Sequence, residues 1–164
     1  MHVFGKPSLA TASMHESTIS ATCTCLSLRQ AARQVSQFYD RCLAPTGLRT
    51  TQFSVLAHLD RLGPVGIGEL AAALVTDRTT MGRALRPLER DGLVAIGPGR
   101  DGRTRALRLT EAGRARLEAA RPYWREGQAA FEASFGAQES EALRALMGRV
   151  VAACPGDGTV LSES

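Results

Sequence analysis

The basic residues of this chain are concentrated in one segment, residues 77–108. Eight arginines in this segment are accompanied by four acidic residues, and the resulting charge of +4 equals the formal net charge of all 164 residues. A guanidinium group is planar and presents several N–H donors, so it binds phosphate oxygens and the acceptor edge of guanine. Such an excess of arginine indicates an anionic partner, and nucleic acid fits it best.

The first part of this segment has the apolar spacing of a helix. Its apolar residues recur every three or four positions, which predicts one buried side and leaves the arginines on the other. We expect Thr76 or Asp77 to cap the start of this helix and the Asp91-Gly92 pair to end it. The residues of the buried side are Met81, Leu85 and Leu88.

A β-hairpin is predicted next. Residues 93–96 and 104–109 have the composition of short strands and flank a glycine-rich turn. A helix followed by a basic hairpin is typical of a winged helix-turn-helix, whose helix enters the major groove of DNA while the hairpin reaches phosphate or the minor groove. A solvated charged helix beside a surface hairpin is the alternative for either piece alone. The candidate DNA-binding residues are Arg78, Thr79, Thr80, Arg83, Arg86, Arg100, Arg103 and Arg105.

Apolar spacing predicts further helices on both sides of this segment, so the expected fold class is mainly α with a small β-hairpin wing. A helix starts at Leu26 and ends before Pro45, and Thr110 caps a long helix that Pro122 should kink or split and Gly136 should end. The other predicted helices span residues 50–62, 69–75 and 137–153.

The first helix and the last two are more apolar than a winged helix needs for its own core. We expect them to pack against the same helices of a second copy, which would place two recognition helices about one DNA turn apart over an inverted repeat. Packing within one chain is the alternative. The expected organisation is a disordered tail at 1–22, a helical dimerisation region at 23–48 and 110–153, a winged helix-turn-helix DNA-binding domain at 49–109, and a C-terminal tail at 154–164.

Several other classes of protein fit this sequence poorly. No apolar run approaches the about 18 residues of a membrane span, and the N-terminal tail lacks the pattern of a secretion signal, so we expect a cytoplasmic protein. Aromatic residues make up 5% of the chain, too few for stacking on single strands. No catalytic motif or cofactor-binding loop is present, and we expect neither enzymatic activity nor a cofactor. A winged helix used only for protein–protein contact is the competing hypothesis.

Six short motifs in this order resemble the MarR family of bacterial transcription regulators: residues 47–53, 69–71, 77–80, 88–93, 101–103 and 109–113. The resemblance implies dimeric winged-helix repressors that bind palindromic operators and release them when a small phenolic or aromatic acid, or an oxidant, acts on the protein. By position it implies base or backbone contacts from Thr79, Thr80, Arg83 and Arg86, and a minor-groove contact from Arg103.

The sequence departs from the family pattern at two places. Gly66 and Gly68 stand where a residue with a hydroxyl group commonly caps the third helix, which we expect to loosen the local fold. Pro87 stands near the end of the predicted recognition helix, where it should interrupt that helix and limit base reading to its first two turns.

The cysteines suggest a redox alternative within the same fold. Cys25 precedes Gly47 by the spacing found in the peroxide-sensing OhrR branch of the family, and Tyr39 matches one tyrosine that bonds the reactive thiolate there. Arg29 and Thr50 replace the other two tyrosines, so the match is partial. Arg29, one helical turn from Cys25, would stabilise a thiolate. The candidate redox residues are Cys23, Cys25, Cys42 and Tyr39.

Other interpretations of these cysteines remain open. A cysteine on an apolar helical face often serves only as a small buried residue. A bridge between Cys25 and Cys42 of one chain is excluded, because a helix would separate them by about 25 Å. Bridges between subunits are open. Cys23 and Cys25 would suit a soft metal, but no further ligands complete a site, and we predict none.

A ligand pocket is the other regulatory possibility. The resemblance places it between the dimerisation helices and the DNA-binding lobe, where a small aromatic carboxylate would meet basic and aromatic side chains. His58 could equally be a hydrogen-bonded surface residue. The candidate pocket residues are Arg33, Phe38, His58 and Tyr39.

Overall fold

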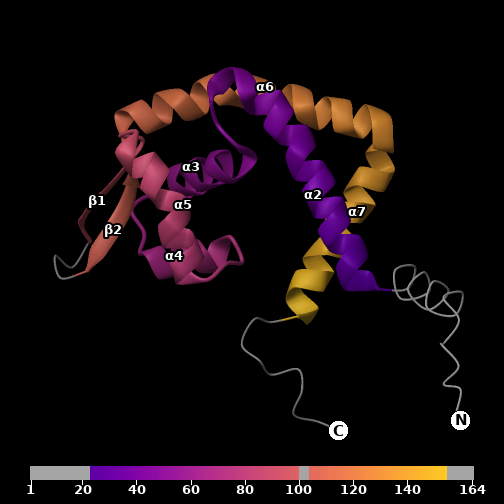
Figure 1. Ribbon diagram of the computed structural model, residues 1–164, viewed down its shortest axis with the longest axis horizontal. Coiled ribbons are helices and arrows are strands. Elements are labelled where there is room, and N and C mark those ends of the chain that lie inside the picture. The colour runs from indigo at the N-terminus through magenta and orange to yellow at the C-terminus, as the bar shows by residue number, and fades with distance from the viewer. Residues whose placement is uncertain (1–22, 100–103, 155–164) are drawn as a thin grey trace, which may run out of the picture. The chain divides into compact units, whose positions relative to one another are not determined.

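The computed structural model describes residues 23–99 and 104–154 (Figure 1). These residues form helices and one two-stranded antiparallel sheet, so the expected fold class is confirmed. The elements are α2 (Thr24–Leu43), the short 3-10 helix η1 (Ala44–Thr46), α3 (Thr50–Leu62), α4 (Ile67–Ala73), α5 (Arg78–Arg90), β1 (Val94–Pro98), β2 (Arg105–Leu109), α6 (Glu111–Phe135) and α7 (Ala137–Ala153).

The chain divides into two compact units. The first ends at Phe38, and the second runs from Tyr39 onward. Of the first unit, the structure describes the N-terminal part of α2, where the backbone N–H of Leu26 points at the sulfur of Cys23 at 3.4 Å. The domain boundaries and the two tails remain predictions; residues 1–22 and 155–164 lie outside the described residues.

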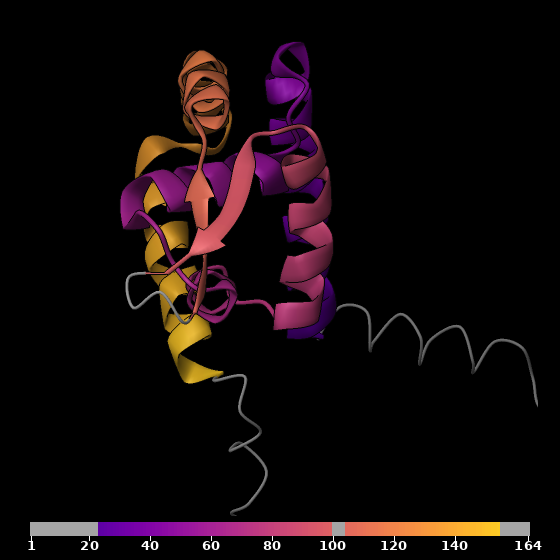
Figure 2. The same ribbon diagram turned by 90° about the vertical axis from the view of Figure 1, so that its left-hand side faces the viewer.

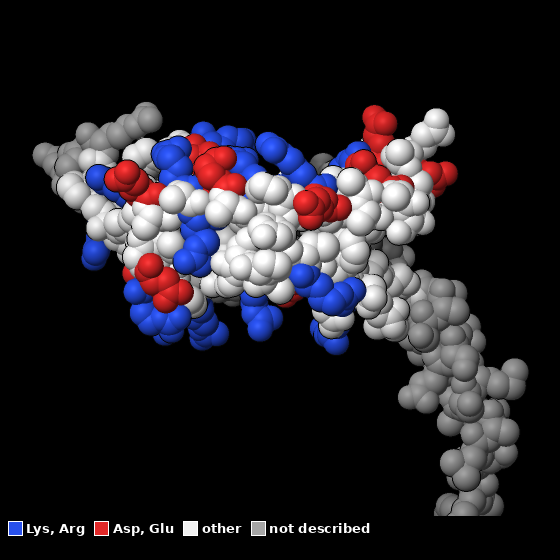
Figure 3. Space-filling view, turned by 90° about the horizontal axis from the view of Figure 1, so that it is seen from above, with Lys and Arg blue, Asp and Glu red and all other residues white. Residues whose placement is uncertain are grey.

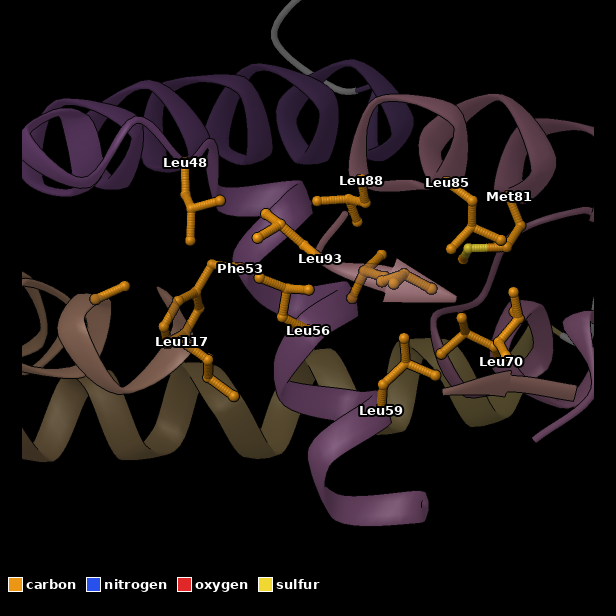
Figure 4. Packing of buried hydrophobic residues seen from close by; sticks show 14 of the residues in the cluster. Leu48, Phe53, Leu56, Leu59, Leu70, Met81, Leu85, Leu88, Leu93 and Leu117 are labelled. Atoms are coloured by element: carbon orange, nitrogen blue, oxygen red, sulfur yellow. The ribbon is translucent and has the colours of Figure 1, made fainter. Parts of the chain in front are cut away.

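The core of the second unit lies between α3, α4, α5, the hairpin and the start of α6 (Figure 4). The predicted apolar side of α5 is confirmed, because Met81, Leu85 and Leu88 are all buried and point toward α3 and α4. Val55 of α3 is also buried, although the sequence did not single it out. Removing a buried leucine from such a core costs about 2–5 kcal/mol of unfolding free energy. The core therefore fixes α5 with its arginine side outward.

Proline does not break either of the two α-helices that contain it among the described residues. We expected Pro87 to interrupt α5, but α5 continues through it to Arg90, so that prediction is wrong. Proline removes only one backbone hydrogen bond, and the burial of Leu88 holds the last turn against the core. Likewise α6 is one helix across Pro122, next to the fully buried Ala120, so the expected split does not occur.

Helix α4 begins and ends two residues earlier than the predicted range 69–75. Glu69 explains the early start, since its carboxylate accepts the backbone N–H of Gly66 at 2.9 Å and so supplies a cap without a hydroxyl group. The helix stops before Val75, which has a φ of +51° and cannot continue a right-handed helix. The turn from Leu74 to Asp77 then leads into α5.

The hairpin is attached to the helical core through the loop before α4. Its two strands lie side by side (Figure 2), and their register pairs Val94 with Leu109 and Ile96 with Leu107. Val65 extends the pairing, because its N–H and C=O groups both bond to the backbone of Leu107, at 3.1 and 2.8 Å. The strands lie within a residue or two of the predicted ranges. The wing is therefore held at a defined place beside the helix-turn-helix.

Helix α6 starts against Leu93, the residue that precedes β1. Thr110 caps it, since its hydroxyl oxygen accepts the N–H of Gly113 at 2.9 Å. Gly113 packs so closely that a Cβ there would lie 2.0 Å from the carbonyl oxygen of Leu93. Gly136, with a φ of +102°, ends α6 and leads into α7, as predicted. None of the described helices has the length and apolar character needed to cross a membrane.

Candidate nucleic-acid interface

Helix α5 presents a cationic front, which we define as the exposed residues Arg78, Thr79, Thr80, Arg83 and Arg86. All five were predicted to contact DNA, and all five are exposed on α5, whereas Met81, Leu85 and Leu88 of the same helix are buried. Within the described residues, none of the three arginines lies within ion-pair distance of a carboxylate. As far as the described part of the chain shows, their donors are left for an external partner.

The start of α5 is fixed by Asp77, one of the two predicted caps. Its carboxylate accepts the backbone N–H of Thr80 at 2.9 Å and the Thr80 hydroxyl at 2.6 Å. These hydrogen bonds from Thr80 lower the pKa of Asp77 below its ordinary value, so the carboxylate stays ionised at neutral pH. The Thr80 hydroxyl donates its hydrogen to this cap, which leaves its oxygen only as an acceptor.

The wing contributes one described residue to the predicted interface. Arg105 is exposed at the start of β2, opposite Pro98 in the register. Arg100 and Arg103, the predicted tip residues, lie outside the described residues. Arg108 is committed to the hairpin itself, because its guanidinium donates to the carbonyl oxygen of Pro98 at 2.9 Å.

Two ion-pair clusters that the sequence did not indicate hold α6 in place. Asp60 of α3 forms an ion pair with Arg114 and another with Arg121, the latter at 3.0 Å, and Arg121 also contacts Glu118 at 2.7 Å. Arg144 of α7 pairs with Glu132 of α6. Because Asp60 precedes its partners by 54 and 61 residues, no local pattern could have revealed them.

Tyr39, predicted as a partner of a reactive thiolate, is buried against α6. Its hydroxyl donates to Gln128 at 2.7 Å, and Gln128 donates in turn to Glu132 at 2.8 Å. Burial raises the pKa of Tyr39, and the nearby Cys42 and Glu132 raise it further, so the phenol stays protonated. The hydrogen bond from Gln128 and the one from Arg144 lower the pKa of Glu132. In the described residues, Tyr39 thus starts a chain of hydrogen bonds.

The four cysteines are free thiols in different surroundings. Cys25 is exposed near the start of α2, and Cys154 is exposed after α7. Cys42 packs on α6, where a Cβ at Gly127 would lie 3.1 Å from its sulfur. In the part of the chain that the structure describes, no group of three or more His, Cys, Asp or Glu residues could hold a metal ion.

The predicted ligand pocket draws on both compact units. Arg33 and Phe38 belong to the first unit and His58 to the second, so a pocket formed by them remains a prediction. His58 donates from Nδ1 to the carbonyl oxygen of Ser54, one turn earlier on α3, at 2.8 Å. This hydrogen bond within α3 is what the alternative predicts, in which His58 is a hydrogen-bonded surface residue.

Comparison with curated proteins relates this chain to transcription regulators. A model of the MarR family matches residues 48–96. The transcriptional activatory protein BadR of Rhodopseudomonas palustris is 34% identical over 91 residues. The match covers 53% of this chain and 52% of BadR, so the chain spans about half the length of that relative. An uncharacterised HTH-type transcriptional regulator of Bacillus cereus is 33% identical over 110 residues, which cover 67% of this chain and 71% of that protein.

Solved structures give a match over most of the chain. The transcriptional regulator MosR of M. tuberculosis, in complex with DNA, is 44% identical, with a TM-score of 0.69. The match covers 80% of this chain and 98% of MosR. Family model, sequence relatives and fold agree, and the chain belongs to the MarR family of transcription regulators.

Proposed function

We propose that this protein is a transcription regulator that binds double-stranded DNA through the cationic front of α5 and the wing. One observation carries the proposal: the arginines of the front are exposed and have no carboxylate partner among the described residues, while the back of the same helix is buried. A charged surface of this kind leaves its donors for phosphates and base edges. The DNA complex of MosR, a relative of similar fold, supports it.

In this proposal α5 enters the major groove and α4 crosses the sugar-phosphate backbone, as in other helix-turn-helix proteins. Arg83 and Arg86, which are both exposed on α5, then read bases. Arg105 and the predicted tip residues Arg100 and Arg103 contact phosphate or the minor groove. Thr79 and Thr80, in the first turn of α5, contact a base or the backbone of the DNA.

We further propose that the regulator is a homodimer that binds an inverted repeat in the cytoplasm. The exposed apolar side chains at the C-terminal end of the second unit support this, since a face of this kind is usually covered by a partner. A second copy would present two α5 helices about one DNA turn apart. The exposed apolar residues are Phe135, Leu146, Val150 and Val151.

Two signals are proposed for releasing DNA. In the first, the protein is a repressor released by a small aromatic or phenolic acid bound near Arg33, Phe38, Tyr39 and His58, as the family resemblance implies. In the second, a peroxide oxidises the Cys25 thiolate to a sulfenic acid, and the peroxide is reduced to water or an alcohol. The exposure of Cys25 supports the second, because oxidants reach exposed thiols most readily.

The decisive experiment selects preferred duplexes from a random pool with the purified protein, with and without peroxide. We expect an inverted repeat in which each half matches one α5 helix. Loss of the selected duplex after peroxide, reversed by a thiol reductant and absent in Cys25→Ser, would support thiol sensing. Loss on adding small aromatic acids without peroxide would support the ligand.

Gel-shift titrations at several salt concentrations then separate DNA binding from a protein-interaction module. We expect Arg83→Ala and Arg86→Ala to relax sequence preference, each by roughly tenfold or more. Arg103→Ala should weaken binding to all sequences and make the salt dependence shallower. Arg125→Ala, an exposed arginine of α6, is the matched control. Binding that none of the three front or wing changes affects would contradict the proposal.

A further inference from the structure

Arg78 differs from the other arginines of the front because it lies against a glycine of the neighbouring helix. A Cβ placed on Gly68 would stand 2.8 Å from Nη2 of Arg78, 3.0 Å from Nε and 3.1 Å from Cζ. Three atoms of one guanidinium group therefore lie against the backbone of α4. Any side chain at position 68 would have to displace this group.

The backbone does not require glycine at this position. Gly68 lies inside α4 and is absent from the glycines with positive φ. Glycine is also the least favourable helix residue apart from proline, so it weakens a helix of only seven residues. The space that Gly68 leaves for the Arg78 side chain explains why glycine fits at this position. Gly68, which together with Gly66 makes up one of the two departures from the family pattern, thus creates a seat for Arg78.

The seated guanidinium keeps its charge available. Within the described residues, Arg78 has no carboxylate within ion-pair distance, and Glu69, the nearby acid on α4, uses its Oε2 to cap Gly66. Among the described residues, the Arg78 guanidinium group donates no hydrogen bond to Gly68, which it only contacts. The result is an exposed positive group at the junction of α4 and α5.

We infer that Arg78 binds a DNA phosphate rather than a base, and that Gly68 is the residue that positions it. This inference rests on the proposed DNA-binding function. A side chain that lies against α4 is not directed along the front of α5 toward base edges. It lies beside the first helix of the helix-turn-helix, where the sugar-phosphate backbone crosses. The contact adds affinity to every sequence and specificity to none.

A double-mutant cycle tests the inference on the full chain and its selected duplex. Arg78→Ala should weaken binding about tenfold at low salt, equally for matched and mismatched duplexes. It should also reduce the slope of log Kd against log salt by about 0.9 for each protomer. Gly68→Ala should weaken binding in the same way but by less, because the charge remains and only its position changes. In the Arg78→Ala background, Gly68→Ala should have no further effect.

Stability measurements distinguish displacement of Arg78 from damage to the fold. Since the tip of Arg78 can move and alanine favours a helix, Gly68→Ala should keep or raise the Tm while it weakens DNA binding. A Gly68→Ala effect that persists without Arg78, or an Arg78→Ala effect confined to one base pair, would overturn the inference. A wild-type protein that binds no duplex would instead overturn the proposed function itself.

Discussion

Helices α5 and α6 each carry four arginines, yet these arginines have different partners. On α6, Arg114 and Arg121 pair with Asp60, and Arg116 donates to the backbone oxygen of Thr46 at 3.1 Å. On α5, among the described residues, only Arg90 forms an ion pair, at 3.0 Å with Asp91. Figure 3, seen from the side on which α6 lies in Figure 1, shows acidic side chains beside basic ones.

The difference shows that arginine content alone does not identify a binding surface. A paired guanidinium has already exchanged water for a carboxylate, so it contributes to the fold and offers little to a ligand. An unpaired, exposed one keeps both its charge and its donors. Replacing arginines on α5 should therefore change DNA binding with little change in stability, and breaking the ion pairs of α6 should do the reverse.

Charge reversal on α5 should have the largest effect. Arg86→Glu places a carboxylate against the DNA and should weaken binding by more than about a hundredfold, because like charges at an interface cost several kcal/mol. Arg125→Glu on α6 should change Kd by less than about threefold at 0.15 M salt, where the Debye length is only about 8 Å. Fluorescence anisotropy with the selected duplex measures both. Equal losses from the two variants would remove the distinction between the helices.

Loss of Asp60 should mainly destabilise the fold. The Asp60 side chain is 19% exposed, and its substitution by asparagine breaks the ion pairs with Arg114 and Arg121 that tie α3 to α6. We expect Asp60→Asn to lower the unfolding free energy by about 1.5 kcal/mol, a value reduced by the solvent around Arg114. Urea unfolding measures it. A double variant with Arg121→Gln should show a smaller loss than the sum of the single variants.

The sequence predicted the parts of this molecule that depend on local pattern. The periodicity of Met81, Leu85 and Leu88 determined which side of α5 is buried and hence which side carries the front. The predicted ranges 50–62 and 137–153 agree with α3 and α7. Gly63 and Pro64 mark the end of α3, and Gly136 marks the start of α7. These features follow from neighbours a few residues apart.

Contacts between distant segments could not be predicted in this way. The ion pairs of Asp60 and the seat of Arg78 on Gly68 depend on how the helices pack. The sequence predicts that Pro87 interrupts α5, because proline removes a backbone hydrogen bond within the helix. The burial of Leu88 against the core outweighs the loss of this one hydrogen bond. Gly68 was interpreted as a missing cap, while the cap comes from Glu69, one position further on.

The start of α6 gives a smaller, purely structural effect. The hydroxyl of Thr110 accepts the N–H of Gly113 and donates to the carbonyl oxygen of Gly92 at 2.7 Å. Thr110→Ala removes the hydrogen bonds of this hydroxyl and should lower the unfolding free energy by about 1 kcal/mol. Thr110→Ser keeps the hydroxyl and should recover most of it. Urea unfolding of both variants tests this, and equal losses would assign the effect to the methyl group instead.

The smallest effect concerns how the caps of α5 and α6 respond to acid. Asp77 caps α5 with a carboxylate whose pKa is lowered below its ordinary value by hydrogen bonds from Thr80, whereas Thr110 caps α6 with a group that does not titrate. A carboxyl with a lower pKa in the folded state stabilises the fold fully above its unfolded pKa, and this contribution disappears as the pH falls through the folded pKa. Asp77→Asn preserves an acceptor at the cap but removes the titration. Between pH 6 and pH 3, urea unfolding should therefore show a larger loss of unfolding free energy for the wild type than for Asp77→Asn. Thr110→Ala should lose as much as the wild type over this range. Parallel pH profiles for all three proteins would show that the Asp77 cap does not contribute to acid sensitivity.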